Sequence, residues 1–133
     1  MWVWLKFFSW VILTLAFSNA YAQSRPWTDE ELLWGVAAGT TLAIDWGQTH
    51  WAAQNNWAGT SNFPKGIHEN NLILGKNPSV KQVNQYFLLV TPLLYVLADQ
   101  YDEYRKPLLI ATTVLESIVI INNNVHVGMQ FSF

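Results

Sequence analysis

Residues 32–54 read LLWGVAAGTTLAIDWGQTHWAAQ, and this stretch decides the fold class. Its only ionisable side chains are Asp45 and His50. A helix needs about 20 mainly apolar residues to cross a bilayer, at a rise of about 1.5 Å per residue, so the stretch is long enough to span. Thr28 and the acidic residues after it are typical of a helix N-terminus, because they bind the free N–H groups of the first turn. The sequence therefore predicts a membrane-spanning helix over about 29–54.

Two further stretches of the chain are apolar and nearly free of charge. Residues 82–98 carry no charged side chain, and residues 107–121 carry only Glu116. They predict spanning helices over about 80–99 and 107–123. The connection between these helices is too short for anything but a tight turn, so they should form an antiparallel hairpin.

The composition of the whole chain supports a membrane location. Of its 133 residues, 51% are hydrophobic and 12% are charged, whereas ordinary soluble domains are about 25% charged. The length allows one domain, and the absence of cysteine excludes disulfide bonds and thiolate chemistry. A formal net charge of -2 provides no basic surface for phosphates, so nucleic acid is not an expected partner.

The sequence over 1–22 has the order of a secretory signal peptide. Lys6 precedes an apolar run over 7–17, and a small-x-small cleavage motif follows over 20–22. We expect cleavage after this motif, with an uncleaved membrane anchor as the alternative. In either case the next residue lies outside the inner membrane. The lysines of the loop over 55–81 then give a weak positive-inside bias, which agrees with a bacterial inner-membrane location.

Residues 125–133 alternate apolar and polar side chains and end in Phe133, a pattern that predicts a short strand or extended segment. A terminal aromatic residue on such a strand is also typical of outer-membrane barrels, which makes the outer membrane the alternative location. A barrel needs about eight alternating strands, however, and the long apolar runs of this chain do not alternate. We therefore expect residues 23–133 to form a single all-α membrane domain. It should contain about three transmembrane helices, one plus a hairpin, and a short extended C-terminal segment.

Asp45 and Glu116 lie inside apolar stretches, where a charged side chain costs about 2.5–3.5 kcal/mol on insertion. Each acid therefore needs a partner. Helical spacing places Gln48 and Thr49 on the face of Asp45, and Asn123 on the face of Glu116. Two such helices can bury the acids against one another with one proton shared. The pair is then either an interhelical hydrogen bond that sets register or a site for an ion, proton or small polar ligand.

The loop over 67–79, IHENNLILGKNPS, has the composition of a shaped turn. Gly75 can adopt a positive φ, Ser79 can cap the following helix, and Glu69 and Asn71 are polar groups near the membrane surface. A metal site would need acids and histidines of several segments to converge, and no H-E-x-x-H spacing supports one. No Ser/His/Asp order or Gly-rich phosphate loop is present either. We therefore predict no catalytic residues, metal or cofactor, and no enzymatic activity.

Four strings of the sequence resemble those of a known group of proteins. The strings are D-W-G-Q-T over 45–49, E-x-N-x-x-L-G-x-x-P-S over 69–79, V-N-x-Y-F over 83–87, and N-x-x-x-G over 124–128. They are similar to those of small uncharacterised membrane proteins of bacteria and their phages, over roughly residues 40–131. This chain has Leu72 where those proteins have proline. The resemblance implies a membrane protein and names no reaction.

These observations select a cluster of polar residues within or beside the membrane: Asp45, Gln48, Thr49, Glu69, Asn71, Asn84, Glu116 and Asn124. The expected function is a structural or interaction role in the cell envelope, for a protein of bacterial or phage origin. Its expected partners are the lipid bilayer and a second copy or a larger membrane protein. The alternative is an intramembrane polar site that binds or transfers an ion, proton or small ligand. A phage lysis or superinfection-exclusion factor is the second alternative, and it depends on the resemblance alone.

Overall fold

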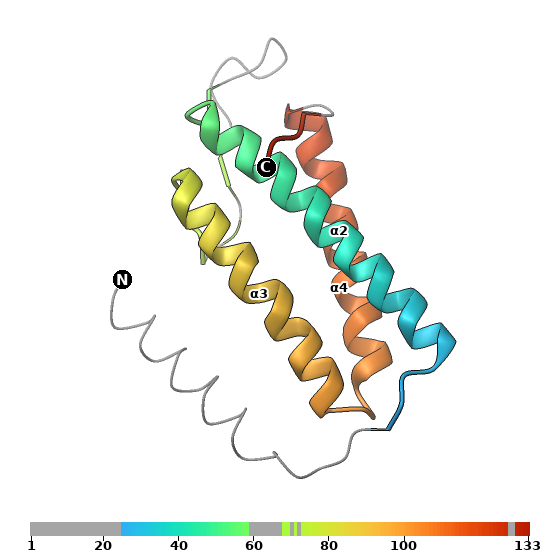
Figure 1. The fold of residues 1–133 in the computed structure, drawn as a ribbon. Coiled ribbons are helices and arrows are strands. Elements are labelled where there is room, and N and C mark those ends of the chain that lie inside the picture. The colour runs from blue at the N-terminus through green and yellow to red at the C-terminus, as the bar shows by residue number, and fades with distance from the viewer. Residues whose placement is uncertain (1–24, 59–67, 70, 72, 128–129) are drawn as a thin grey trace.

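The computed structural model describes residues 25–58, 68–69, 71, 73–127 and 130–133. These residues form three helices, which are α2 (Asp29–Gln54), α3 (Val80–Gln100) and α4 (Arg105–Val127). The helices run alternately up and down a bundle (Figure 1). The described residues contain no strand, so the all-α class is confirmed. The signal peptide expected over 1–22 lies outside them.

Two of the helices begin with the capping residues that the sequence predicts. Thr28 accepts a hydrogen bond from the Glu31 backbone at 3.2 Å, and the Glu31 carboxylate accepts one from the Thr28 backbone at 2.9 Å. Ser79 and Gln82 form the same reciprocal arrangement at the start of α3. Each box satisfies two N–H groups that have no partner within the helix.

Of the two forms predicted for residues 125–133, a strand or an extended segment, the strand is wrong. α4 continues to Val127, several residues beyond its expected end, and residues 130–133 have no regular structure. A strand needs a neighbouring strand to accept its hydrogen bonds, and none exists among the described residues. The Ser132 N–H of this tail donates to the Gly47 carbonyl at 3.1 Å.

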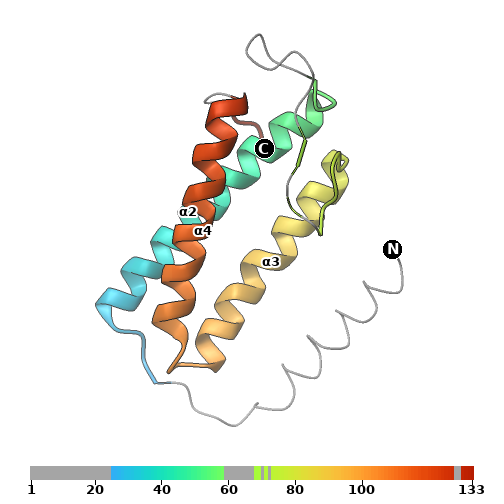
Figure 2. The same ribbon diagram turned by 180° about the vertical axis from the view of Figure 1, so that it is seen from behind.

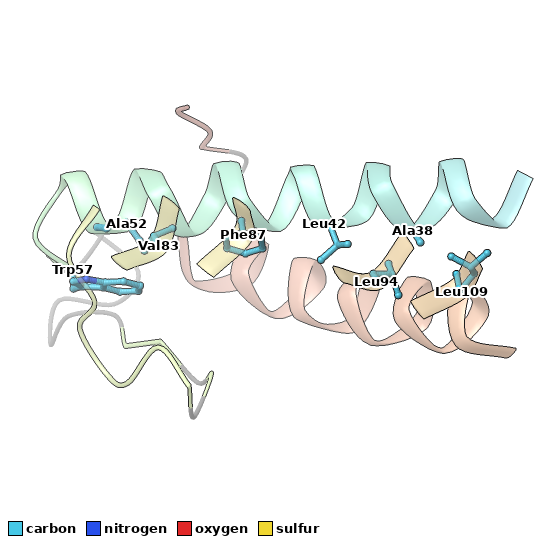
Figure 3. Close-up of a cluster of buried hydrophobic side chains, with 10 residues drawn as sticks. Ala38, Leu42, Ala52, Trp57, Val83, Phe87, Leu94 and Leu109 are labelled. Carbon is cyan, nitrogen blue, oxygen red and sulfur yellow. The ribbon is translucent and has the colours of Figure 1, made fainter. Parts of the chain in front are cut away.

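α2 is the central element of the bundle. It packs most extensively against α4, which lies beside it in both views (Figures 1 and 2), and less extensively against α3. α3 and α4 contact each other least, although only residues 101–104 separate them. Figure 3 shows the apolar core along α2, to which all three helices contribute: Ala38, Leu42, Ala52, Trp57, Val83, Phe87, Leu94 and Leu109.

Polar and apolar side chains are distributed unusually over this bundle. Six polar or charged residues are buried: Glu31, Asp45, Gln48, Thr49, His50 and Arg105. Large aliphatic side chains are exposed on every helix, among them Leu32, Leu33, Val36, Leu88, Leu89, Val114, Leu115, Ile118 and Ile121. When apolarity is averaged over all side chains of a helix, α4 is the one described helix long and apolar enough to cross a membrane, over Arg105–Val125. Only 6% of its apolar window is buried.

Candidate functional site

Asp45 is the centre of a polar network between α2 and α4. The residue is only 8% exposed. Its Oδ1 accepts a hydrogen bond from Asn123 Nδ2 at 2.8 Å, across the helix interface, and one from Thr49 Oγ1 at 3.3 Å, one turn along α2. Two donors therefore stabilise the same carboxyl oxygen, one from each helix.

Glu116 of α4 lies on the same helical face as Asn123, the residue that donates to Asp45, and its Oε2 atom is buried without a hydrogen-bond partner. Two ionised carboxylates buried at one helix interface repel each other, which favours a proton on one of them. The ion pairs of the described residues involve Arg25, Arg105 or Lys106, and none of these pairs includes Asp45 or Glu116. Hydrogen bonds from Asn123 and Thr49, rather than a cation, therefore stabilise Asp45.

The loop before α3 adds a third acid to this region. Glu69 Oε2 accepts a long hydrogen bond of 3.5 Å from Thr49 Oγ1, and Glu69 Oε1 accepts one of 2.8 Å from the Asn71 backbone. Tyr86 of α3 lies near Asn71. The loop thus contacts α2 one helical turn from Asp45, through Thr49. We call Asp45, Glu69 and Glu116 the acid cluster.

The other predicted residues of the polar set form no hydrogen bond with the acid cluster. Asn84 Oδ1 accepts a hydrogen bond from Trp46 Nε1 at 2.9 Å, and the Trp46 ring stacks on Phe87. Gln48 is buried, and neither atom of its amide group has a hydrogen-bond partner. Asn124 is exposed on α4.

Two contributors to this region lie outside the predicted polar set. Helical spacing places Asn123 on the face of Glu116, and this spacing is the signal that favours it over Asn124. Tyr86 lies near Asn71, which the loop before Ser79 brings toward α3. No spacing rule in the sequence predicts that contact.

The C-terminal tail packs against α2 beside the acid cluster. His50 Nδ1 and Ser132 Oγ lie 3.0 Å apart, and the Phe133 ring meets Trp46 edge-on at 6.0 Å between centroids. A Cβ atom on Gly47 would lie 3.0 Å from the Phe133 ring, so glycine is what allows this close approach. The tail thus covers the last turns of α2.

The opposite end of the bundle holds a second charged cluster, formed by Arg25, Glu31 and Arg105. We call it the paired-charge cluster. Arg105 is 0% exposed and donates to the Ala98 carbonyl at 2.8 Å, to the Arg25 carbonyl at 3.3 Å and to Glu31 Oε2 at 3.4 Å. Its guanidinium also lies 4.7 Å from the centre of the Trp27 ring. The sequence predicts the last helix from about residue 107, which leaves Arg105 in the connecting turn, but α4 begins at Arg105 and carries it against α2.

Glu31 is the acid of the paired-charge cluster. Arg25 Nη1 donates to Glu31 Oε2 at 2.8 Å, and the Thr28 backbone donates to the same carboxylate. The hydrogen bond from Arg25 and the one from the Thr28 backbone lower the pKa of Glu31 from 4.5 to about 2. This carboxylate is therefore ionised at neutral pH and fully paired.

Among the described residues, no group of three or more histidine, cysteine, aspartate or glutamate side chains could hold a metal ion. The acid cluster therefore lacks the geometry of such a centre. Comparisons with protein families, with functionally curated proteins and with solved structures give no match for this chain.

Proposed function

We propose that this protein is a small integral membrane protein whose three helices all cross the bilayer, with a structural or interaction role. The observation that supports it best is the distribution of side chains, in which charged and polar groups are buried and large aliphatic groups are exposed. Water would disfavour that exposed aliphatic surface, whereas lipid solvates it. Polar groups inside a membrane bundle, conversely, face neighbouring helices.

The polar residues of α2 do not argue against a span. Asp45, Gln48, Thr49 and His50 lower the average apolarity of this helix, but all four are buried inside the bundle. The surface that α2 presents outward includes Leu32, Leu33 and Val36 instead. With 26 residues, α2 is long enough for a bilayer core of about 30 Å.

The same reasoning applies to α3. It has 21 residues, and Leu88, Leu89 and Val96 are exposed along it. The paired-charge cluster lies at the C-terminal end of α3 and would be at one membrane surface. The loop that contains Glu69 precedes α3 and would be near the opposite membrane surface. We propose the bacterial inner membrane as the location, with residues 1–22 as the leader.

Arginine substitution at two equally exposed aliphatic positions tests this proposal. Leu115 is 63% exposed on α4 and Ile73 is 71% exposed in the loop. In a bilayer Leu115→Arg places a charge in lipid at a cost of about 2.5–3.5 kcal/mol, whereas Ile73→Arg stays in water and is the matched control. We expect Leu115→Arg alone to lower the amount of chain that resists alkaline extraction from membranes. Equal behaviour of the two variants, or release of the wild-type chain by alkali, would contradict a membrane span.

Density separation of the membranes tests the location. The proposal expects the chain in the inner-membrane fraction, starting at Gln23 if the leader is removed. Recovery in the outer-membrane fraction would reject the inner-membrane assignment, and a mature chain that starts at Met1 would show an uncleaved anchor instead.

A polar intramembrane site is the second candidate function. It is favoured by one observation, the buried amide group of Gln48 without a partner beside the acid cluster. Buried polar groups are almost always hydrogen-bonded, and an unsatisfied one calls for an explanation such as a bound ligand or water.

A further inference from the structure

Two unpartnered polar groups lie in the same part of α2 and α4. Gln48 is 1% exposed, and both its Nε2 and its Oε1 lack a hydrogen-bond partner. It follows Asp45 by three residues, which places it on the same face of the helix. Glu116 Oε2 is also buried without a partner. Buried donor and acceptor atoms of Gln48 and Glu116 thus lack hydrogen-bond partners within the protein. A small polar ligand would supply those hydrogen bonds.

We propose that Asp45 and Glu116 form a proton-binding site, in which the two carboxyl groups hold one exchangeable proton and Gln48 holds the water that receives it. Release transfers the proton from the carboxyl pair to this water, which leaves two carboxylates and a hydronium ion, and uptake is the reverse. This inference rests on the proposed membrane placement, because a low dielectric is what makes a second negative charge costly there.

The ligand class follows from the groups that surround the pair. Asn123 Nδ2 and Thr49 Oγ1 both donate to Asp45 Oδ1. Two donors can stabilise one negative charge on the carboxyl pair. Glu116 Oε2 is buried without a hydrogen-bond partner, and one proton on the pair would supply the hydrogen for such a bond. A metal ion would instead need several ligands around one point, and the described residues offer no such group of three. A proton needs no coordination shell.

An exchange route leads from the pair toward the loop. Thr49 Oγ1 lies 3.3 Å from Asp45 Oδ1 and 3.5 Å from Glu69 Oε2, so one hydroxyl group connects the buried acid with a half-buried one. Tyr86 of α3 faces the same region and lies near Asn71. On α2 the remaining titratable neighbour, His50, is bonded to Ser132. Glu69 is therefore the acid through which a proton can enter or leave.

Infrared spectroscopy of the full chain in lipid bilayers tests the proton site. At about pH 7 free carboxyl groups are ionised, so the C=O band of a protonated carboxyl group reports a bound proton. We expect this band in the wild-type protein, with a shift in D₂O. The double variant Asp45→Asn with Glu116→Gln should lose it and retain its helical circular dichroism. Glu103→Gln, at an exposed acid of the turn, is the control and should keep the band.

Further measurements separate the possible outcomes. Glu69→Gln retains an acceptor for Thr49 and Asn71 but cannot relay a proton, so deuterium exchange of the band should slow by about tenfold or more. If the double variant does not fold, Glu116→Gln alone should shift or remove the band. A folded, membrane-inserted wild type without the band would overturn the proton site and leave the membrane placement intact. A band that sodium chloride abolishes and choline chloride does not would show a cation site instead.

Discussion

The two ends of the bundle bury charge in opposite ways. In the paired-charge cluster, Glu31 meets the guanidinium groups of Arg25 and Arg105, and every group has an opposite charge or a carbonyl as partner. In the acid cluster, no ion pair of the described residues includes Asp45 or Glu116, and an amide and a hydroxyl group donate to Asp45 instead. The first arrangement holds a fixed charge, whereas in our proposal the second can change its charge by one proton. The paired-charge cluster is therefore expected to stabilise the fold, whereas the acid cluster is the candidate binding site.

Arg105→Met should have the largest effect, because it removes the cation that lies deepest in the paired-charge cluster. Breaking a buried ion pair by deleting one partner costs about 3–5 kcal/mol, and since Arg25 still pairs with Glu31 we expect about 3 kcal/mol. Lys106→Met is the matched control. Lys106 is half-exposed and bonds Glu30 at 2.8 Å, so its loss should cost under about 1 kcal/mol. Unfolding in detergent gives the free energy of unfolding of both variants. Equal decreases for Arg105→Met and Lys106→Met would show that the buried ion pair of Arg105 adds no special stability.

Substitutions in the acid cluster should destabilise the protein less than Arg105→Met does. The effects of substitutions at Asp45 and Glu116 should be strongly coupled. Glu116→Gln keeps a hydrogen-bonding group beside Asp45 and should be mild, whereas Glu116→Leu removes it and should cost about 1–3 kcal/mol. Asp45→Leu combined with Glu116→Leu should recover part of that loss, because no buried acid then lacks its partner. Thermal unfolding in detergent gives the coupling. Losses that simply add would mean that the two acids are energetically independent.

The contrast between the two ends also explains what the sequence could and could not predict. The helices follow from apolar runs and capping residues, which are local features, and their bounds agree within a few residues at most ends. The burial of Arg105 depends on how α4 packs against α2, and no local pattern reports that. Asn123 and Asn124 differ by one residue but point about 100° apart on a helix, so only the packing decides between them.

The predicted strand failed for a similar reason. Alternation of apolar and polar side chains describes one segment, whereas a strand is stabilised by a partner. Residues 125–127 join the hydrogen-bond ladder of α4 instead, and Phe133 packs against Trp46 as a single aromatic contact. For the acid cluster, helical spacing identified Asp45, Thr49 and Glu116, but it could not show that Gln48 lacks a partner.

Between the two ends, a glycine sets the distance from α2 to α3. A Cβ atom on Gly39 would lie 2.5 Å from the Tyr95 hydroxyl group, which donates to the Gly35 carbonyl at 2.6 Å. Gly39→Ala should therefore cost about 1–2 kcal/mol through overpacking. In a Tyr95→Phe background the same change should be nearly neutral, because the clashing oxygen is gone. Unfolding measurements on the four chains give the coupling, and an equal cost of Gly39→Ala in both backgrounds would locate the strain elsewhere.

The smallest expected effect is on the pH dependence of unfolding, which should differ between the two ends of the bundle. Glu31 lies one residue before the apolar stretch of α2, and its pKa falls from 4.5 to about 2 in the folded protein, chiefly through the hydrogen bond from Arg25. A folded-state pKa below the unfolded one means that the ionised carboxylate stabilises the fold. This contribution is complete above about pH 4.5 and is lost as the pH falls toward 2. Glu31→Gln should remove that part of the acid dependence of unfolding in detergent and leave the response of the acid cluster unchanged. An unaltered acid profile in Glu31→Gln would mean that the paired-charge cluster does not titrate in this range, and that its charge is fixed by burial alone.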